Sequence, residues 1–308
     1  MSLFQRLNSI KNRIPDQTAE LKQPSPVLLP EGQEISSKFG KCVMLEESTP
    51  GTFHFPEYDP ADLLLNLKLI KGIGPVTEVK LREQGVANVS DLIEHPRWGG
   101  HARYVKDLIE QRRVKELQSV GAKDRELLSY FDPEDILFLD IETTGLWASQ
   151  PLFLVGLLYH RKGKLLVNQV FARHYREEKA VLAAANELIQ DFKVVVSFNG
   201  KRFDIPYISG RSVEHRLFYS YPHHQVDLLY HARRQYRDIL PNCRLTTLEE
   251  HILDFRRQDD IPGYLIPETY HRFTQKQEAS LIQPVLEHNR LDLLAMVKLF
   301  KLVIHDAG

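Results

Sequence analysis

Short apolar runs and amphipathic segments alternate in the second half of the chain, from about residue 135 onward. Continuous apolar stretches of this length are typical of strands buried inside a sheet. They cover residues 136–140, 152–159, 165–171 and 194–198. Segments 177–189 and 284–303 repeat apolar residues at helical spacing instead. Strands that first follow each other in hairpins and then alternate with helices predict an α/β fold, a mixed sheet covered by helices.

A second pattern, short helices separated by glycines, occupies residues 57–128. Asp59 followed by Pro60 is a good helix start, because aspartate caps the helix and proline suits its first turn. The spacing of apolar residues predicts helices over 61–69, 75–84, 91–95 and 102–120. The segment is therefore expected to form a small all-α domain.

The first 56 residues show neither pattern. Six prolines punctuate them, polar residues fill the gaps, and only 41–45 has the composition of a short strand. We interpret this segment as an irregular arm, either a plain linker or a loosely docked extension. The predicted organisation is an arm (1–56), a helical domain (57–128) and an α/β domain (131–308).

Composition excludes several classes of protein. The 308 residues are 43% hydrophobic and 26% charged, with a net charge of -1, so a strongly basic tail-driven nucleic-acid binder is excluded. Apolar runs fall short of the roughly 18 residues that span a membrane, and the start lacks the apolar core of a secretory signal. Two distant cysteines form no disulfide framework. We expect a cytoplasmic protein without a membrane partner.

Four carboxylates stand out by their position. Asp140 and Glu142 flank Ile141 at the end of the first predicted strand, and alternating strand side chains point to the same face. Asp204 follows the fourth strand. Asp292 lies in the last helix, four residues after His288, so that these two share a helical face.

Convergence of these residues would create a site for hard metal ions. Mg²⁺ and Mn²⁺ prefer carboxylate and water oxygens. Two such ions, about 3.5–4 Å apart, stabilise the attacking and leaving oxygens of a phosphodiester, while a neutral histidine takes a proton from water. Each carboxylate taken alone has a plainer interpretation as a solvated surface group. The order and context of all four favour the metal site.

In this context, residues 135–304 resemble the DEDD, or DnaQ-like, exonucleases of the ribonuclease H-like fold. Residues 138–145, Phe-Leu-Asp-Ile-Glu-Thr-Thr-Gly, resemble their first motif. Residues 199–204 resemble the second, and 288–292 the third. The YprB-like family is the most similar subgroup, on Val155-Gly156, Asp260-Ile261-Pro262-Gly263 and 286–292.

The resemblance implies that two divalent ions, Mg²⁺ or Mn²⁺, are held by the carboxylates. Those ligands would be Asp140, Glu142, Asp204 and Asp292. His288 would be the general base. Three residues lie between His288 and Asp292, which is the spacing of the family's tyrosine variant. The alternative is a helix-surface histidine that is hydrogen-bonded to a neighbour.

Further residues between the motifs are candidates for substrate contact. Thr143 and Gly145 would let the backbone approach a 3′ end, and Asn199 would hydrogen-bond the terminal nucleotide. Phe203 is expected in the core. Asp227 is either a carboxylate that supports the site or a solvated cap. The pairs His223-His224 and Arg256-Arg257 are interpreted as an ordinary loop pair and an ion-paired loop.

The segment 69–92 resembles a helix-hairpin-helix DNA-binding unit. Gly72 and Gly74 permit a tight turn and expose backbone N–H groups, and Lys71 and Lys80 would add charge for a phosphate. Glu78 stands where the motif usually has a small residue. The alternative is a degenerate hairpin that serves only packing or a protein contact.

The leading hypothesis is a metal-dependent 3′→5′ exonuclease that acts on single-stranded or frayed nucleic acid. The hairpin favours DNA over RNA. One rival is a non-catalytic nucleic-acid-binding or scaffold protein that kept the fold, and another is a structure-specific endonuclease. Protein partners are not indicated by the sequence.

Overall fold

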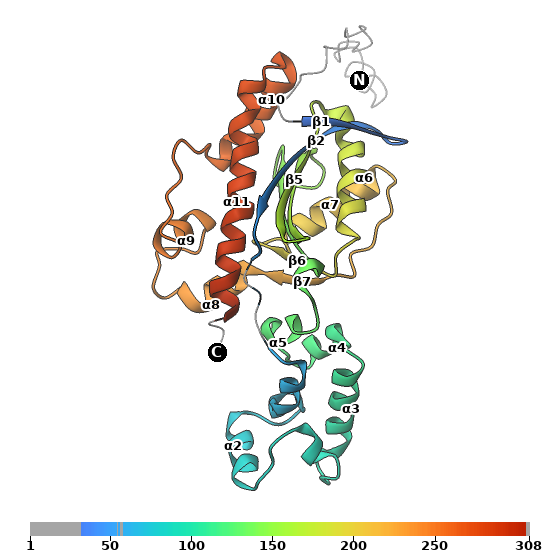
Figure 1. The fold of residues 1–308 in the computed structure, drawn as a ribbon, viewed down its shortest axis with the longest axis vertical. Coiled ribbons are helices and arrows are strands. Elements are labelled where there is room, and N and C mark those ends of the chain that lie inside the picture. Colours follow the sequence, from blue (N-terminus) through green and yellow to red (C-terminus); the bar gives the residue numbers. More distant parts are fainter. Residues whose placement is uncertain (1–31, 54, 56–57, 306–308) are drawn as a thin grey trace, which may run out of the picture.

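A computed structural model of the chain describes residues 32–53, 55 and 58–305. Figure 1 shows an elongated molecule in which a sheet with helices on both sides occupies one part and a block of short helices the other. Residues 60–128 contain short helices joined by turns and loops. The mixed sheet confirms the predicted α/β class.

Seven strands form one sheet within the described residues. They are β1 Gly32–Ser37, β2 Gly40–Pro50, β3 Ile136–Thr143, β4 Leu152–Arg161, β5 Lys164–Phe171, β6 Val194–Ser197 and β7 His224–Asp227. Their order is β1-β2-β5-β4-β3-β6-β7. β3 pairs parallel with β6, β6 pairs parallel with β7, and the other pairs are antiparallel.

The helices of the α/β part cover both sides of the sheet. They are α6 Glu178–Ile189, α7 Asp204–Glu214, α8 Leu228–Tyr236, α9 Leu245–His251, α10 Ile266–Lys276 and α11 Ala279–His305, with short 3-10 turns at Pro133–Asp135, Tyr175–Glu177 and Gly263–Leu265. Figure 1 shows α11 on one side and α6 and α7 on the other. α11 begins five residues before the predicted start and carries Pro284 inside it.

Alternation along β3 separates two hydrophobic cores. Leu137, Leu139 and Ile141 join a cluster with α6, α7 and α10. Ile136 and Phe138 join the other, with α8, α9 and the second half of α11. The even-numbered positions of β3 therefore face α11. The even-numbered residues that follow Phe138 along the strand point to the same side.

The predicted irregular arm is wrong for residues 32–50. These residues form the β1–β2 hairpin, and β2 pairs with β5 from Val43 opposite Phe171 to Pro50 opposite Lys164. Cys42 and Val43 are buried in the core, while most of β2 is polar because it lies near the sheet edge. The predicted short strand at 41–45 lies within β2, whereas the pairing of β2 with a strand more than a hundred residues away has no local signal. Residues 1–31 of the arm lie outside the described part.

The helical block differs in detail from its prediction. It contains 3-10 helices Pro60–Leu65, Leu67–Leu69 and Val89–Leu92 and helices α2 Pro75–Glu83, α3 Gly99–Glu110, α4 Val114–Ser119 and α5 Asp124–Leu128. The predicted helix 102–120 is interrupted between α3 and α4, where Arg112 takes a left-handed φ of 52°. Asn66, whose N–H bonds to Leu63, separates the two 3-10 turns that replace the predicted helix 61–69.

Asp124 joins the block to the sheet. Its carboxylate lies 3.1 Å from His224 Nε2 at the start of β7 and 2.9 Å from His231 Nε2 in α8. Burial raises the pKa of Asp124, but the two imidazoles outweigh this and leave the pKa below its ordinary value. His224 is therefore buried in a strand, and not part of an ordinary loop pair as predicted.

None of the described helices combines the length and the apolar character needed to cross a bilayer.

We expect Phe138→Ala to destabilise the protein by about 3–5 kcal/mol, because Phe138 is fully buried and meets Phe53 and Phe300 edge to face. Urea unfolding measures the change. Phe218→Ala is the matched control, since Phe218 is 80% exposed and its truncation should change stability by less than about 0.5 kcal/mol. Equal effects of the two substitutions would contradict the assignment of the core.

Candidate active site

Asp140 and Glu142 continue the even-numbered face of β3 toward α11. Burial is the largest influence on both, followed by the charge of Asp292, and together these raise the pKa of Asp140 and of Glu142 well above their ordinary values. A cation beside the two carboxyl groups would favour their charged forms and oppose this rise in pKa. The strand alternation predicted from the sequence brings them to one face.

Asn289 of α11 fixes the Asp140 carboxylate. Its Nδ2 donates to Asp140 Oδ2 at 2.8 Å, and its Oδ1 accepts from Gln169 Nε2 at 2.9 Å. The Asn289 side chain lies directly over Gly156, where a Cβ would come within 2.2 Å of Oδ1. Gly156 is therefore needed for close approach of the helix. Asn289 and Gly156 belong to motifs of the sequence, but no role was predicted for either residue. The contribution of Gln169 was not predicted.

Asp204 opens α7 beside the same strand. Burial raises its pKa to about 7, although the backbone N–H groups of Asp204 and Ile141 oppose the rise. Gly200 makes room for this approach, since a Cβ there would lie 2.3 Å from Ser197 Oγ and 3.0 Å from Asp204 Oδ2. Close packing thus explains why the second motif has glycine at position 200.

Asp227 supports the loop that carries Asn199. It is 1% exposed and accepts from the N–H of Asn199 at 2.8 Å, of Lys201 at 3.3 Å and of Leu229 at 3.1 Å. Asn199 takes a left-handed φ of 69°, which asparagine tolerates better than most residues. Of the two interpretations of Asp227, the structure favours a buried group that holds the site loop and caps α8.

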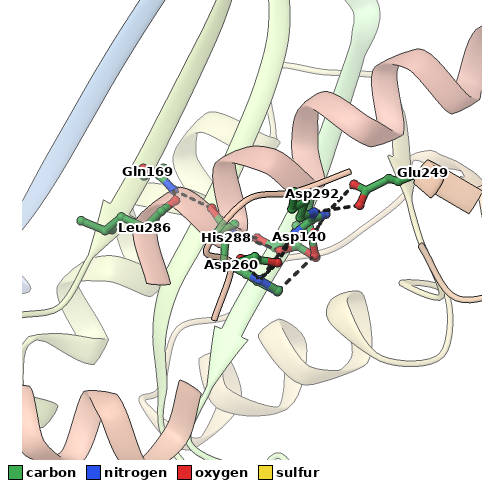
Figure 2. A network of polar contacts seen from close by, with 9 residues as sticks. Asp140, Gln169, Glu249, Asp260, Leu286, His288 and Asp292 are labelled. Carbon is green, nitrogen blue, oxygen red and sulfur yellow. Dashed lines mark hydrogen bonds and ion pairs between the residues drawn. The ribbon is translucent and has the colours of Figure 1, made fainter. Parts of the chain in front are cut away.

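His288 and Asp292 project from α11 as their spacing predicted. His288 Nδ1 lies 2.8 Å from Asp260 Oδ1, and His288 Nε2 lies 3.8 Å from Asp292 Oδ2 (Figure 2). The contact with Asp260 holds the proton on Nδ1 and leaves Nε2 as the basic nitrogen that faces the carboxylates. Asp260 belongs to a motif of the sequence, but no role was predicted for it.

Arg257 is the cation of this cluster. Its side chain is 5% exposed and contacts Asp292, Glu249 at 2.5 Å and Asp260 at 3.0 Å. Burial lowers its pKa, but the carboxylates outweigh burial and raise it. The ion-paired interpretation of this loop is confirmed. Sequence reasoning missed that the arginine lies against a predicted metal ligand, because 35 residues separate them.

The donor set fits divalent ions by its chemistry. Oxygen ligands suit Mg²⁺ and Mn²⁺, and buried carboxyl groups with raised pKa values are those that a cation would deprotonate. Within the described residues, no group of three or more His, Cys, Asp or Glu side chains has the arrangement of a formed metal site. Arg257 contacts Asp292, one of the predicted ligands.

The other predicted contact residues divide into two places. Thr143 and Gly145 lie where β3 ends, and Thr143 Oγ1 donates to the Gly145 carbonyl at 2.7 Å. The hairpin residues lie elsewhere, since Gly74 caps α2 and α2 is at the far end of the helical block from the sheet (Figure 1). Lys71, Gly72, Gly74 and Lys80 are therefore not brought to the carboxylates.

Glu78 is neutralised locally. It lies 3.3 Å from Lys68 and 3.6 Å from Arg82. Glu78, which departs from the hairpin motif, therefore pairs with cations of its own segment. Phe203 packs against the core beside Tyr207, as predicted.

Comparison with known proteins supports the fold and the family. The family model described as RNase_H superfamily matches residues 137–304, more than half of the 308 residues, so the chain belongs to the RNase_H superfamily. This confirms the ribonuclease H-like fold predicted from the motifs.

One curated protein and one solved structure are similar to the chain. The "Uncharacterized protein YprB" of Bacillus subtilis (strain 168) is 32% identical over 174 residues, which are 55% of this chain and 42% of that protein. The chain thus spans less than half of that relative's length. The family B DNA polymerase from the hyperthermophilic archaeon Pyrobaculum calidifontis aligns with a TM-score of 0.45 at 17% identity, over 56% of this chain and 25% of the polymerase.

The raised pKa of Asp204 has a consequence for stability. A carboxyl group whose pKa is higher in the folded state contributes stability in full below its ordinary pKa of 3.8, and this contribution is lost progressively until pH reaches about 7. We expect Asp204→Asn to gain stability relative to the metal-free parent between pH 5 and pH 8, by on the order of a few kcal/mol.

Thermal unfolding in EDTA at both pH values measures this difference. Added Mg²⁺ or Mn²⁺ should raise the midpoint of the parent at pH 8 more than that of the variant. A variant-to-parent difference that does not change with pH would contradict the assignment.

Proposed function

We propose that this member of the RNase_H superfamily is a metal-dependent 3′→5′ exonuclease of single-stranded or frayed nucleic acid, with DNA favoured over RNA. The observation that supports the proposal is that carboxylates from three separate segments lie near enough for the charge of one to act on the others. Asp140, Glu142 and Asp204 have raised pKa values, and Asp292 contributes to each of these shifts. Carboxylates that raise one another's pKa in this way are stabilised by a cation between them.

The chain's own residues have distinct roles in this mechanism. Asp140, Glu142, Asp204 and Asp292 would hold two Mg²⁺ or Mn²⁺ ions, which when bound activate water and neutralise the scissile phosphate. Asn289 orients Asp140 through the 2.8 Å hydrogen bond. Asp260 keeps the proton of His288 on Nδ1, so that Nε2 accepts a proton from the attacking water.

The predicted contacts around the carboxylates complete the proposal. Thr143 and Gly145 at the end of β3 would receive the 3′-terminal nucleotide, and Asn199 would hydrogen-bond it. The left-handed conformation of Asn199 presents its side chain on a loop held by Asp227. The hydrolysed strand would therefore enter between the ends of β3 and β6.

The helical block is proposed as a separate nucleic-acid handle, with domains at 57–128 and 131–308. A groove of about 620 Å³ in it is lined by Lys68, Lys71, Gly72, Arg97 and His101, among others. Gly72 takes a φ of 91°, which opens the tight turn before α2. Lys71 and Lys80 would hold the phosphate backbone without reading bases.

We expect Asp140→Asn to abolish hydrolysis, because metal ligands contribute several kcal/mol to the barrier and each 1.36 kcal/mol is tenfold in rate. The loss should exceed about a hundredfold. The assay follows 5′-labelled single-stranded DNA and RNA with Mg²⁺ or Mn²⁺. Asp238→Asn is the matched control, since its side chain is 84% exposed.

The substrates separate the rival functions. A ladder of shortened products, absent in EDTA and in the Asp140→Asn variant, supports the exonuclease. Cleavage of a circular strand indicates an endonuclease instead. Binding of either strand without any cleavage would favour the non-catalytic reading of the fold.

A second prediction concerns Asn289. We expect Asn289→Leu to lower both activity and Mn²⁺ affinity by about 10–100-fold, because residues that orient a metal ligand have effects of this size. Mn²⁺ titration calorimetry and the nuclease assay give the two values. Asn168→Leu is the control, since Asn168 is also buried and donates instead to Tyr159. Equal losses in both variants would assign Asn289 to packing alone.

A further inference from the structure

A cavity opens next to the carboxylates on the side of α8 and α9. It has a volume of about 490 Å³, within the range of roughly 300–1,000 Å³ typical of pockets for small ligands. Asp140 and Asp292 line one part of it. Arg233, Asn242 and Arg244 line another. The cavity thus joins the predicted metal ligands to a group of cationic and amide side chains.

The two cavity arginines differ from the buried arginines of the same domain. Arg257 and Arg211 contact carboxylates at 2.5 and 2.6 Å. Arg233 and Arg244 are exposed, and neither forms an ion pair with any residue in the described part of the chain. Their guanidinium groups remain available, and guanidinium matches phosphate with paired hydrogen bonds.

Local structure fixes where these arginines stand. Arg233 lies in the last turn of α8, whose start is capped by the buried Asp227. Arg244 precedes α9, and its N–H donates to Asn242 Oδ1 at 3.0 Å, which also accepts from Thr247 Oγ1 at 2.7 Å. Arg233 thus stands on α8, and Arg244 is the residue from which α9 begins.

The remaining lining suits the organic part of a nucleotide. Phe198 is half-buried at the end of β6, and Leu229 and Leu245 are 8% and 9% exposed. An aromatic and aliphatic wall between carboxylates and guanidinium groups accommodates a sugar and a base.

We propose that this cavity binds one nucleotide unit of a single strand next to the scissile phosphate, and that Arg233 and Arg244 hold the neighbouring phosphodiester. The proposal rests on the proposed nuclease function and names residues that no motif of the sequence contained. Its ligand class is a single-stranded polynucleotide. The arginines set the position of the strand, while the carboxylates act on the next bond.

Cys243 supplies a reporter inside the cavity. It lines the cavity and is half-buried. The other cysteine, Cys42, is 1% exposed, and burial raises the pKa of its thiol to about 12. A thiol reagent such as a maleimide therefore labels Cys243 selectively. Cys243→Ser shows the background of the measurement.

The experiment measures labelling of Cys243 in the full-length protein with and without a single-stranded oligothymidylate, in EDTA and in Ca²⁺. Fluorescence anisotropy measures binding of the same strand. We expect the bound strand to slow labelling at least fivefold. The double variant Arg233→Ala/Arg244→Ala should lose this protection, bind at least tenfold more weakly, and lower the salt slope by about 0.7, the value for one phosphate of a single strand.

Arg234→Ala is the matched control. Arg234 is the next residue of α8, is exposed, and does not line the cavity. It should retain both binding and protection, and unfolding midpoints of all variants verify that each is folded. Equal loss in Arg234→Ala would reduce the effect to general charge and overturn the proposal.

Two failures are distinguishable. If the parent binds and hydrolyses the strand, but Cys243 stays equally reactive and the double variant is unaffected, the cavity inference is wrong and the nuclease stands. If the parent neither binds nor hydrolyses the strand, the proposed function fails and the inference with it.

Discussion

Repulsion among neighbouring carboxylates is the constraint on which the rest of this structure depends. Asp204 is 4% exposed, Asp140 and Glu142 are half-buried, and the charge of Asp292 acts on all three. Such a cluster costs several kcal/mol per ion unless protons, donors or cations compensate it. The surrounding elements supply that compensation. A donor from α11 fixes Asp140, backbone N–H groups serve Asp204, and a buried guanidinium holds Asp292.

Each compensating contact requires a small residue or a second partner behind it. Asn289 reaches Asp140 only because position 156 has no side chain, and it is oriented in turn by Gln169. Arg257 can be buried beside Asp292 because Glu249, 2% exposed, shares its charge. Burial of Glu249 raises the pKa of this carboxyl group even so, since the arginine only partly offsets desolvation. The site is therefore a network of contacts, in which removal of one side chain leaves the charge of its partner uncompensated.

The arginines of the domain divide by their partners. Arg211 bonds the buried Glu178, whose carboxylate also accepts from the Leu152 N–H, and Arg173 bonds Glu177. These pairs satisfy charges that the fold itself buries, so they serve the architecture. Arg233 and Arg244 serve no such charge in the described residues, and they stand at the rim of the carboxylate site. Arginines that pair with buried carboxylates therefore differ from arginines whose side chains are free to bind a ligand.

The sequence by itself determined the elements with strong local patterns. The apolar runs of β3 to β6 and the helical spacing of α11 follow from side-chain periodicity, and alternation alone placed Asp140 and Glu142 on one face. Tertiary structure decided what depends on distant partners. The β1–β2 hairpin exists because β5 pairs with it, and Arg257 meets Asp292 across 35 residues of chain. Sequence patterns encode the faces of single elements, whereas charge neutralisation and edge pairing are settled only when those elements pack together.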